Sequence, residues 1–169
     1  MHEMESILNR VEEKKIKGII DLFFEANSIF VYGAGRSGLV AKAFAIRLVH
    51  LGFPTFVVGE TITKPVKKGD LVVLVSSSGE TIPVAMTAEI ARRLGAKIIS
   101  ITSNPDSHIA RFADIPVILK PKNKDASLAP LGTLFEISAW LFLDGIVAQL
   151  MAEKKETEES MKGRHATLE

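Results

Sequence analysis

The 169-residue sequence contains no cysteine, which excludes disulfide bonds, thiolate nucleophiles and cysteine-ligated metal sites. This absence is compatible with a reducing compartment, and a cytoplasmic location is expected. The formal net charge is only +1, so no strong field favours nucleic acid or an anionic membrane as a partner. The four histidines are far apart in the sequence and show no metal-ligand spacing, so no metal site is expected.

Long hydrophobic runs are also missing. No apolar stretch reaches the roughly 18 residues of a membrane span, and the longest, from Trp140 to Leu150, is interrupted by Asp144 and Gln149. The N-terminal residues are charged and amphipathic, without the apolar core of a signal peptide. We therefore expect a soluble chain in which residues 1–169 form one domain with a full-sized core.

The sequence does contain alternating apolar runs and helical patterns. Continuous runs rich in Val and Ile predict five strands, at residues 28–32, 53–58, 71–75, 98–102 and 115–119. Helical spacing predicts helices over residues 4–26, 37–51, 81–94, 107–112 and 131–152. This alternation implies βαβ units. The predicted fold class is α/β, a flavodoxin-like three-layer α/β/α sandwich around a five-stranded parallel sheet.

The segment after the first predicted strand reads Gly-Ala-Gly-Arg-Ser-Gly, over residues 33–38, and opens a helix. Glycines at such a turn let the backbone approach an anion, and the helix N-terminus supplies free N–H groups. The segment also fits the dinucleotide pattern G-x-G-x-x-G, and Glu60 follows the second strand about 22 residues on. A nicotinamide-dependent dehydrogenase and a purely structural strand-to-helix turn are therefore competing interpretations.

The segment after the third predicted strand, Ser-Ser-Ser-Gly-Glu-Thr over residues 76–81, carries four hydroxyl groups. Hydroxyls and backbone amides together make a neutral cradle for a phosphate dianion. Helix capping explains one hydroxyl but not four. A dehydrogenase does not need this second anion-binding loop, and no separate substrate domain fits in the remaining length. The two loops together favour a phosphorylated ligand.

The S-x-S-G-E-T loop after a buried strand, paired with the upstream glycine-rich turn, resembles the sugar isomerase (SIS) domain over nearly the whole chain. Within that family, the ordered set GAGRSG, RLVHLGF, VGET, SSSGET, APLGTLFE and RHATLE is similar to the 6-phospho-3-hexuloisomerases. The resemblance implies interconversion of D-arabino-3-hexulose 6-phosphate and D-fructose 6-phosphate. It also implies a cis-enediol intermediate, with neither a metal nor another cofactor.

The resemblance further implies which residues bind the phosphosugar. Three hydroxyls of the second loop would hold the phosphate, helped by the backbone of its second serine and its glycine. Ser37 would contact the phosphate or a sugar hydroxyl, whereas Arg47 and Glu60 are weaker candidates. The full set is Ser37, Arg47, Glu60, Ser76, Ser77, Ser78, Gly79 and Thr81.

Two residues are candidates for proton transfer. Glu136 lies near the start of a helix among apolar neighbours, where partial desolvation suits a general base. The alternative is an exposed glutamate on a polar helix face. His165, in the RHATLE ending, titrates in the range needed to move a proton between sugar oxygens, and the alternative is a histidine in a disordered tail. A histidine so close to the C-terminus could act in its own subunit or in a neighbour's.

Other members of the family leave alternatives open. Phosphoheptose isomerases carry a glutamate near residues 46–47, where this chain has Ile46 and Arg47, and arabinose 5-phosphate isomerases usually carry an additional regulatory domain. Sugar-phosphate sensors usually join the domain to a DNA-binding helix-turn-helix, but only one helix is predicted before the first strand. Helices 4–26 and 131–152 have more apolar surface than a monomer comfortably exposes. We expect a homo-oligomer, a dimer or tetramer, with these helices and the tail 153–169 in its contacts or its active site.

Overall fold

The computed structural model describes residues 2–121 and 129–168, and its centre is an all-parallel sheet. The strands are β1 (Ile29–Gly33), β2 (Thr55–Val57), β3 (Leu71–Val75), β4 (Lys97–Thr102) and β5 (Ile115–Ile118). Their order in the sheet is β2-β1-β3-β4-β5. All five strands coincide with predicted ones, but β2 is shorter than expected. Pro54, which has no N–H, precedes it, and Gly59, at φ +96°, follows it.

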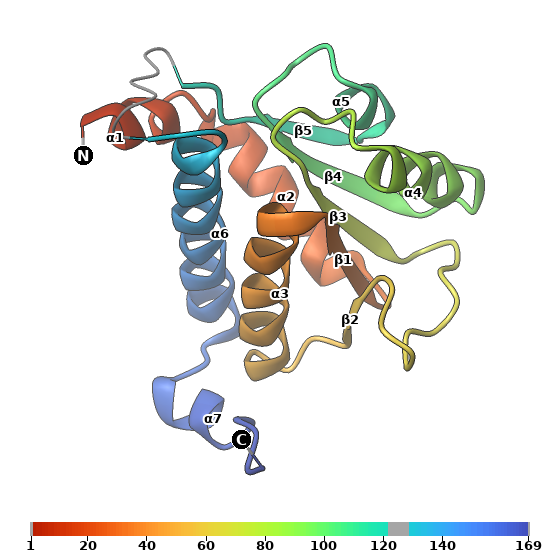
Figure 1. Ribbon diagram of the computed structural model, residues 1–169. Coiled ribbons are helices and arrows are strands. Elements are labelled where there is room, and N and C mark those ends of the chain that lie inside the picture. The colour runs from red at the N-terminus through yellow and green to blue at the C-terminus, as the bar shows by residue number, and fades with distance from the viewer. Residues whose placement is uncertain (1, 122–128, 169) are drawn as a thin grey trace.

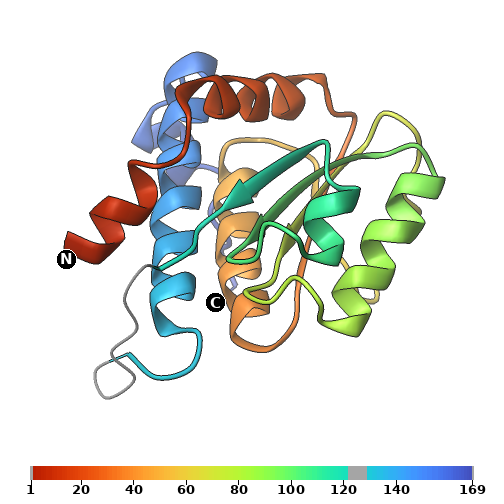
Figure 2. The same ribbon diagram turned by 90° about the horizontal axis from the view of Figure 1, so that it is seen from above.

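Helices cover both faces of the sheet, which confirms the three-layer α/β/α sandwich (Figures 1 and 2). One face carries α4 (Ile82–Arg93) and α5 (His108–Phe112). The other carries α2 (Glu13–Glu25), α3 (Gly35–His50) and α6 (Thr133–Lys154). The short helices α1 (His2–Leu8) and α7 (Glu158–Lys162) lie near the two ends of α6 in Figure 1.

β1, β2, β3 and β4 each contribute to two hydrophobic cores because side chains alternate along a strand. In β3, Val73 and Val75 join the core under α3 and α6, while Val72 and Leu74 join the core under α4. All five residues of β3 are buried, as expected of a central parallel strand.

The prediction of one N-terminal helix over residues 4–26 is wrong, because these residues form α1 and α2 in different directions (Figure 2). In a continuous helix, Ile7 and Phe23 would point about 160° apart at 3.6 residues per turn. Both are buried, so the chain has to bend between them. Arg10 stabilises the bend by donating from its guanidinium to the carbonyl oxygens of Ser6 at 2.9 Å and Lys120 at 2.7 Å.

α6 has 22 residues, and its apolar side chains are spread around the whole helix. Within the described residues it is the one helix long and apolar enough to cross a membrane, a test that core helices of soluble proteins also pass. It packs against α1, α2 and α3 on its inner side. On its outer side, Ile137, Trp140 and Leu141 are exposed, so one chain alone leaves part of the apolar surface of α6 uncovered.

Both edge strands of the sheet are short. β2 has three residues, and β5 has four, including Pro116, which is aligned with Ser100 of β4. Lys15 of α2 donates from Nζ to the carbonyl oxygen of Pro116 at 3.1 Å. α2 therefore covers part of the β5 edge.

Candidate active site

The strand order changes direction between β1 and β3. The chain leaves β1 towards β2 on one side and then returns to form β3 on the other side. In parallel sheets, ligands bind at the carboxyl ends of the strands at such a switch point. The two loops singled out in the sequence, residues 33–38 and 76–81, follow these two neighbouring strands.

Two glycines of the first loop allow α3 to begin directly against the sheet. A Cβ atom on Gly38 would lie 2.6 Å from the carbonyl oxygen of Gly33, and one on Gly33 would lie 2.7 Å from that of Val75. Gly35 differs, because it has φ +56° and open space where a Cβ would be. Ser37 is buried in the first turn of α3 beside these contacts. The loop thus combines close packing with an open N-terminal turn.

The second loop has the properties of an anion cradle. The Ser76 hydroxyl accepts from the N–H of Gly79 at 3.1 Å and lies 3.2 Å from the Thr81 hydroxyl. Thr81 is the N-cap residue of α4, but its side chain makes no capping hydrogen bond. Within the described residues, the N–H groups of Ser77 and Ser78 donate to no protein acceptor. These N–H groups and the hydroxyls are therefore available to a phosphate.

Gly79 fixes the shape of this loop. It has φ +68°, and a Cβ there would lie 2.2 Å from Ser107 Oγ and 2.9 Å from Thr102 Oγ1. Its carbonyl oxygen accepts from the N–H of Ile109, and the Glu80 carboxylate accepts from the N–H of His108 at 2.8 Å. The cradle is therefore anchored to the start of α5, a contact that no local sequence pattern indicated.

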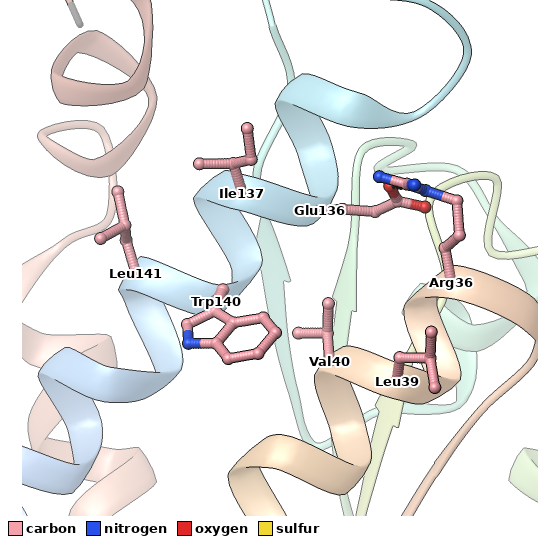
Figure 3. A pocket seen from close by; sticks show the side chains of 7 residues that line it. All are labelled: Arg36, Leu39, Val40, Glu136, Ile137, Trp140 and Leu141. Atoms are coloured by element: carbon pink, nitrogen blue, oxygen red, sulfur yellow. Dashed lines mark hydrogen bonds and ion pairs between the residues drawn. The ribbon is translucent and has the colours of Figure 1, made fainter.

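Glu136 and Arg36 form an ion pair between α6 and α3 (Figure 3). Arg36 Nε donates to Glu136 Oε2 at 2.5 Å. The Glu136 side chain is only 11% exposed, so the alternative of an exposed glutamate does not hold, whereas that of Arg36 is 67% exposed. The pair borders a cavity of about 380 Å³ that is otherwise apolar and is lined by Leu39, Val40, Ile137, Trp140 and Leu141.

A small cavity connects the start of α6 to the phosphate cradle. Ser77 lines it on one side, and Gly132 and Phe135 line it on the other. A Cβ on Gly132 would lie 3.5 Å from Oε1 of Glu136. The first loop, the cradle and Glu136 therefore meet at the same end of the sheet.

Glu60 and Arg47 lie differently with respect to this region. Glu60, after β2, accepts from Lys42 Nζ at 2.6 Å and lines a cavity of about 300 Å³ together with Gly35. Arg47 is exposed in the last turn of α3, about 16 Å along the helix from Arg36. The structure thus brings Glu60 to the margin of the site and leaves Arg47 outside it.

His165 lies far from its own Glu136. Its ring stacks on that of His50 with the centroids 5.0 Å apart, at the C-terminal end of α3. Arg164 holds the tail there by donating to the carbonyl oxygen of His50 at 2.9 Å and to Glu156 at 3.1 and 3.0 Å. Arg36, the partner of Glu136, is about 21 Å from His50 along α3. Within one chain, the two candidate proton-transfer residues are not brought together.

No metal site is formed by the described residues. Across residues 2–121 and 129–168, no group of three or more His, Asp or Glu side chains could hold a metal ion.

Comparison with known proteins assigns the family. The family model described as SIS domain matches residues 22–152. The chain belongs to the SIS domain family. Both loops and Glu136 lie within the matched residues, whereas α1, α7 and His165 lie outside them.

Relatives of this SIS domain chain cover nearly its whole length. A protein of Archaeoglobus fulgidus with no assigned function is 42% identical, with 98% of this chain and 94% of that one covered. The 3-hexulose-6-phosphate isomerase of Bacillus subtilis is 37% identical, with 100% of this chain and 95% of that one covered. A solved structure from Methanococcus jannaschii, with an inferred function of 3-hexulose-6-phosphate isomerase, matches with a TM-score of 0.91 and 34% sequence identity. The match covers 99% of this chain and 98% of that one. The chain is therefore an isomerase of the SIS domain family.

Proposed function

We propose that this isomerase interconverts D-arabino-3-hexulose 6-phosphate and D-fructose 6-phosphate through a cis-enediol. One observation supports this most directly: a hydroxyl-lined cradle and the largely buried Glu136 carboxylate lie at the same end of the sheet. The similarity to proteins named 3-hexulose-6-phosphate isomerase supports the choice of substrate.

In the proposed complex, the cradle binds the phosphate. The hydroxyls of Ser76, Ser78 and Thr81 donate to its oxygens, and the N–H groups of Ser77 and Ser78 add to the field of the α4 N-terminus. The N–H of Gly79, expected to help, donates to the Ser76 hydroxyl instead, so Gly79 contributes through the shape of the loop. Ser37, at the start of α3, contacts a sugar hydroxyl. Glu60 borders the sugar, and Arg47 is left out because it lies three turns along α3.

The proposed reaction moves a carbonyl group between neighbouring carbons. Starting from fructose 6-phosphate, the Glu136 carboxylate removes the proton from C3, and the electrons form the C2–C3 double bond while O2 becomes an enediolate oxygen. A proton then passes from O3 to O2. Glu136 returns its proton to C2 as the C3 carbonyl forms, so atoms and charge balance.

Arg36 has two roles in this scheme. Its Nε holds the Glu136 carboxylate in one orientation. A guanidinium has five N–H donors, so the remaining donors of this exposed side chain can stabilise the enediolate oxygen. A lysine has neither the planar fork nor enough donors in fixed directions to replace it.

We propose that the proton between O3 and O2 is carried by His165 of a neighbouring subunit. The outer side of α6 carries exposed apolar residues, and Gly145, midway along it, has nothing within 4 Å of a Cβ position. Such a position lets a second helix approach closely. Antiparallel pairing of two α6 helices at Gly145 would set Lys154 of one chain beside Glu136 of the other, since both are equally far from Gly145. The tail that follows Lys154 would then lie at the partner's site.

The reaction is tested with fructose 6-phosphate in deuterated water, without added metal or nucleotide. We expect deuterium at C3 and formation of the 3-hexulose phosphate. In Glu136→Gln, both should fall at least 100-fold, because the amide cannot accept the C3 proton. Glu13→Gln, exposed in the first turn of α2 and away from the proposed site, is the matched control and should keep full activity. Deuterium at C1 instead would indicate an aldose–ketose isomerase, and no exchange in folded protein would refute the proposal.

The origin of His165 is tested by mixing chains. Glu136→Gln and His165→Ala are each nearly inactive in the proposed scheme, but hetero-oligomers of the two contain some sites with both wild-type residues. Refolding an equal mixture of the two variants should restore about a quarter of the activity, because by random assortment about one site in four has both wild-type residues. If no activity returns although mixed oligomers form, His165 does not act in trans.

A further inference from the structure

The carbonyl oxygen of Ser77, in the phosphate cradle formed by residues 76–81, accepts three hydrogen bonds from the end of β4. The N–H of Ser103 donates to it at 3.0 Å, the Ser103 hydroxyl at 2.8 Å and the Thr102 hydroxyl at 3.1 Å. Any residue except proline could make the first of these bonds. The other two depend on hydroxyl side chains at residues 102 and 103.

The need to satisfy buried groups explains only one of the two hydroxyls. Thr102 is fully buried, so its hydroxyl needs a partner, and it also accepts from the N–H of Asn104 at 3.2 Å. Ser103 is only half-buried and could bond to solvent instead. It nevertheless donates to an oxygen that has only two lone pairs and already has two other donors. This convergence indicates a role for the Ser77 carbonyl beyond packing.

The three donors fix the direction of the next N–H group. The carbonyl of Ser77 and the N–H of Ser78 belong to one planar trans peptide group, so they point in opposite directions. The carbonyl faces the end of β4, and β3 lies between β4 and β1 in the sheet. The Ser78 N–H is therefore directed to the side of β1 and the first loop. In the part of the chain that the structure describes, it donates to no protein acceptor.

The same bonds make the Ser78 N–H a stronger donor. A carbonyl that accepts hydrogen bonds draws electron density to its oxygen, which increases the positive partial charge on the N–H of the same peptide group. Residues 76–81 include no lysine or arginine, so the cradle depends on hydroxyl and N–H dipoles to attract a dianion. A polarised N–H contributes more to such a site than an ordinary one.

We propose that Thr102 and Ser103 are positioning residues for phosphate binding. Through the Ser77 carbonyl, their hydroxyls orient and polarise the Ser78 N–H towards the phosphate, without touching the ligand themselves. This inference rests on the proposed function, because it uses the same cradle. It makes the end of β4 a third segment of the site, beside the loops that follow β1 and β3.

Variants that separate the hydroxyl group from the shape of the side chain test the proposal. Binding of inorganic phosphate is measured by titration calorimetry, without turnover. Ser103→Ala and Thr102→Val each remove one hydroxyl and should weaken binding about threefold, and the double variant about tenfold. Ser103→Thr and Thr102→Ser keep the hydroxyl and should bind like the wild type, although Thr102→Ser loses a buried methyl group and some stability. Thr87→Val is the matched control, because the Thr87 hydroxyl donates to the carbonyl oxygen of Pro83 at 2.8 Å within α4.

The pattern across these variants distinguishes positioning from structural support. If affinity follows the free energy of unfolding, so that Thr102→Ser binds as weakly as Thr102→Val, the hydroxyls only hold the fold and the proposal is overturned. Unchanged affinity in Ser103→Ala and Thr102→Val also overturns it, as does a wild type that binds no phosphate at millimolar concentration. With fructose 6-phosphate, KM should rise about threefold, more than kcat falls, because the phosphate is remote from C2 and C3. Phosphate binding in the expected pattern without deuterium exchange would refute the proposed reaction and leave this inference standing.

The Ser78 N–H can also be observed directly by nuclear magnetic resonance. Adding phosphate to isotopically labelled protein should move the Ser78 amide-proton resonance downfield, and the movement should be smaller in Ser103→Ala. The Gly79 resonance should move less than that of Ser78, because the Gly79 N–H already donates to the Ser76 hydroxyl. A Ser78 resonance that does not respond to bound phosphate would overturn the proposal, since the N–H would then point elsewhere.

Discussion

Replacing Gly79 with alanine tests whether the phosphate cradle depends on one glycine. Two costs add up. A left-handed φ of +68° costs a residue with a Cβ about 1 kcal/mol. The new methyl group would lie 2.2 Å from Ser107 Oγ and 2.4 Å from its Cβ, in a buried site where overpacking costs about 1–3 kcal/mol. We expect the free energy of unfolding to fall by about 3 kcal/mol, a factor of roughly 150 in the equilibrium constant.

Urea unfolding at one fixed protein concentration measures this loss. With a slope near 2 kcal/mol per molar urea, the midpoint should drop by about 1.5 M. Gly35→Ala is the matched control, because Gly35 also has positive φ but open space around it. It should lose only the backbone cost, about 1 kcal/mol and about 0.5 M urea.

A second substitution separates the steric cost from the backbone cost. Ser107→Gly removes the two nearest atoms that the new methyl group would meet and leaves only Thr102 Oγ1, at 2.9 Å, so Gly79→Ala should cost about 1.5 kcal/mol less in that background. Equal losses in Gly79→Ala and Gly35→Ala, or no coupling to Ser107, would refute the assignment of Gly79 as the residue that shapes the cradle.

Two further predictions concern stability at acid pH and the position of the tail. Burial alone would raise the pKa of the Asp114 carboxyl, but the N–H of Ile98 and the cations of Lys97 and Arg92 outweigh it and hold that pKa below its usual value. Because the pKa of Asp114 is lower in the folded than in the unfolded protein, its ionised carboxylate stabilises the fold. This stabilisation is fully present above the unfolded pKa of about 4, and it is lost as the pH falls through the folded pKa. Asp114→Asn should therefore lower the unfolding free energy by about 1 kcal/mol at pH 7, and the difference from wild type should shrink as the pH falls below about 4 in denaturation experiments. Arg164→Met removes the hydrogen bonds to Glu156 and His50, so amide hydrogen exchange over residues 163–168 should accelerate while the sheet is unaffected. Unchanged exchange there would show that other contacts hold the tail.

The sheet could be predicted because its strands are buried on both faces. A strand such as β3, Leu-Val-Val-Leu-Val, has no polar face and ends abruptly at Ser76, so both its type and its end are visible in the sequence. The same reasoning found the two loops, because ligand-binding segments follow the carboxyl ends of strands. The bend between α1 and α2 was missed, since helical spacing continues on both sides of it. Ile7 and Phe23 would point about 160° apart around one continuous helix, and this angle between two apolar side chains could have indicated the bend.

The geometry of the site was less predictable, because its contacts join distant segments. The ion pair of Arg36 with Glu136 spans 100 residues, and no local pattern reports it. α7 was not predicted either, although Thr157 and Ser160 form a reciprocal capping box that the spacing could have indicated. The RHATLE motif identified His165 as a candidate but carries no information on where the tail lies. That position depends on Arg164 meeting Glu156 and His50.

The short edge strands determine how this protein can grow into an assembly without aggregating. An exposed strand edge is a template on which another chain can extend the sheet indefinitely, towards a fibril. Here β2 offers only three residues, and β5 contains a proline that cannot donate to a ladder and is partly covered by α2. The sheet edges are thereby poor contact surfaces, and any contact between copies of the chain is directed to helical faces, where two-fold contacts close on themselves. The same features that end the sheet therefore favour a finite oligomer over an open polymer.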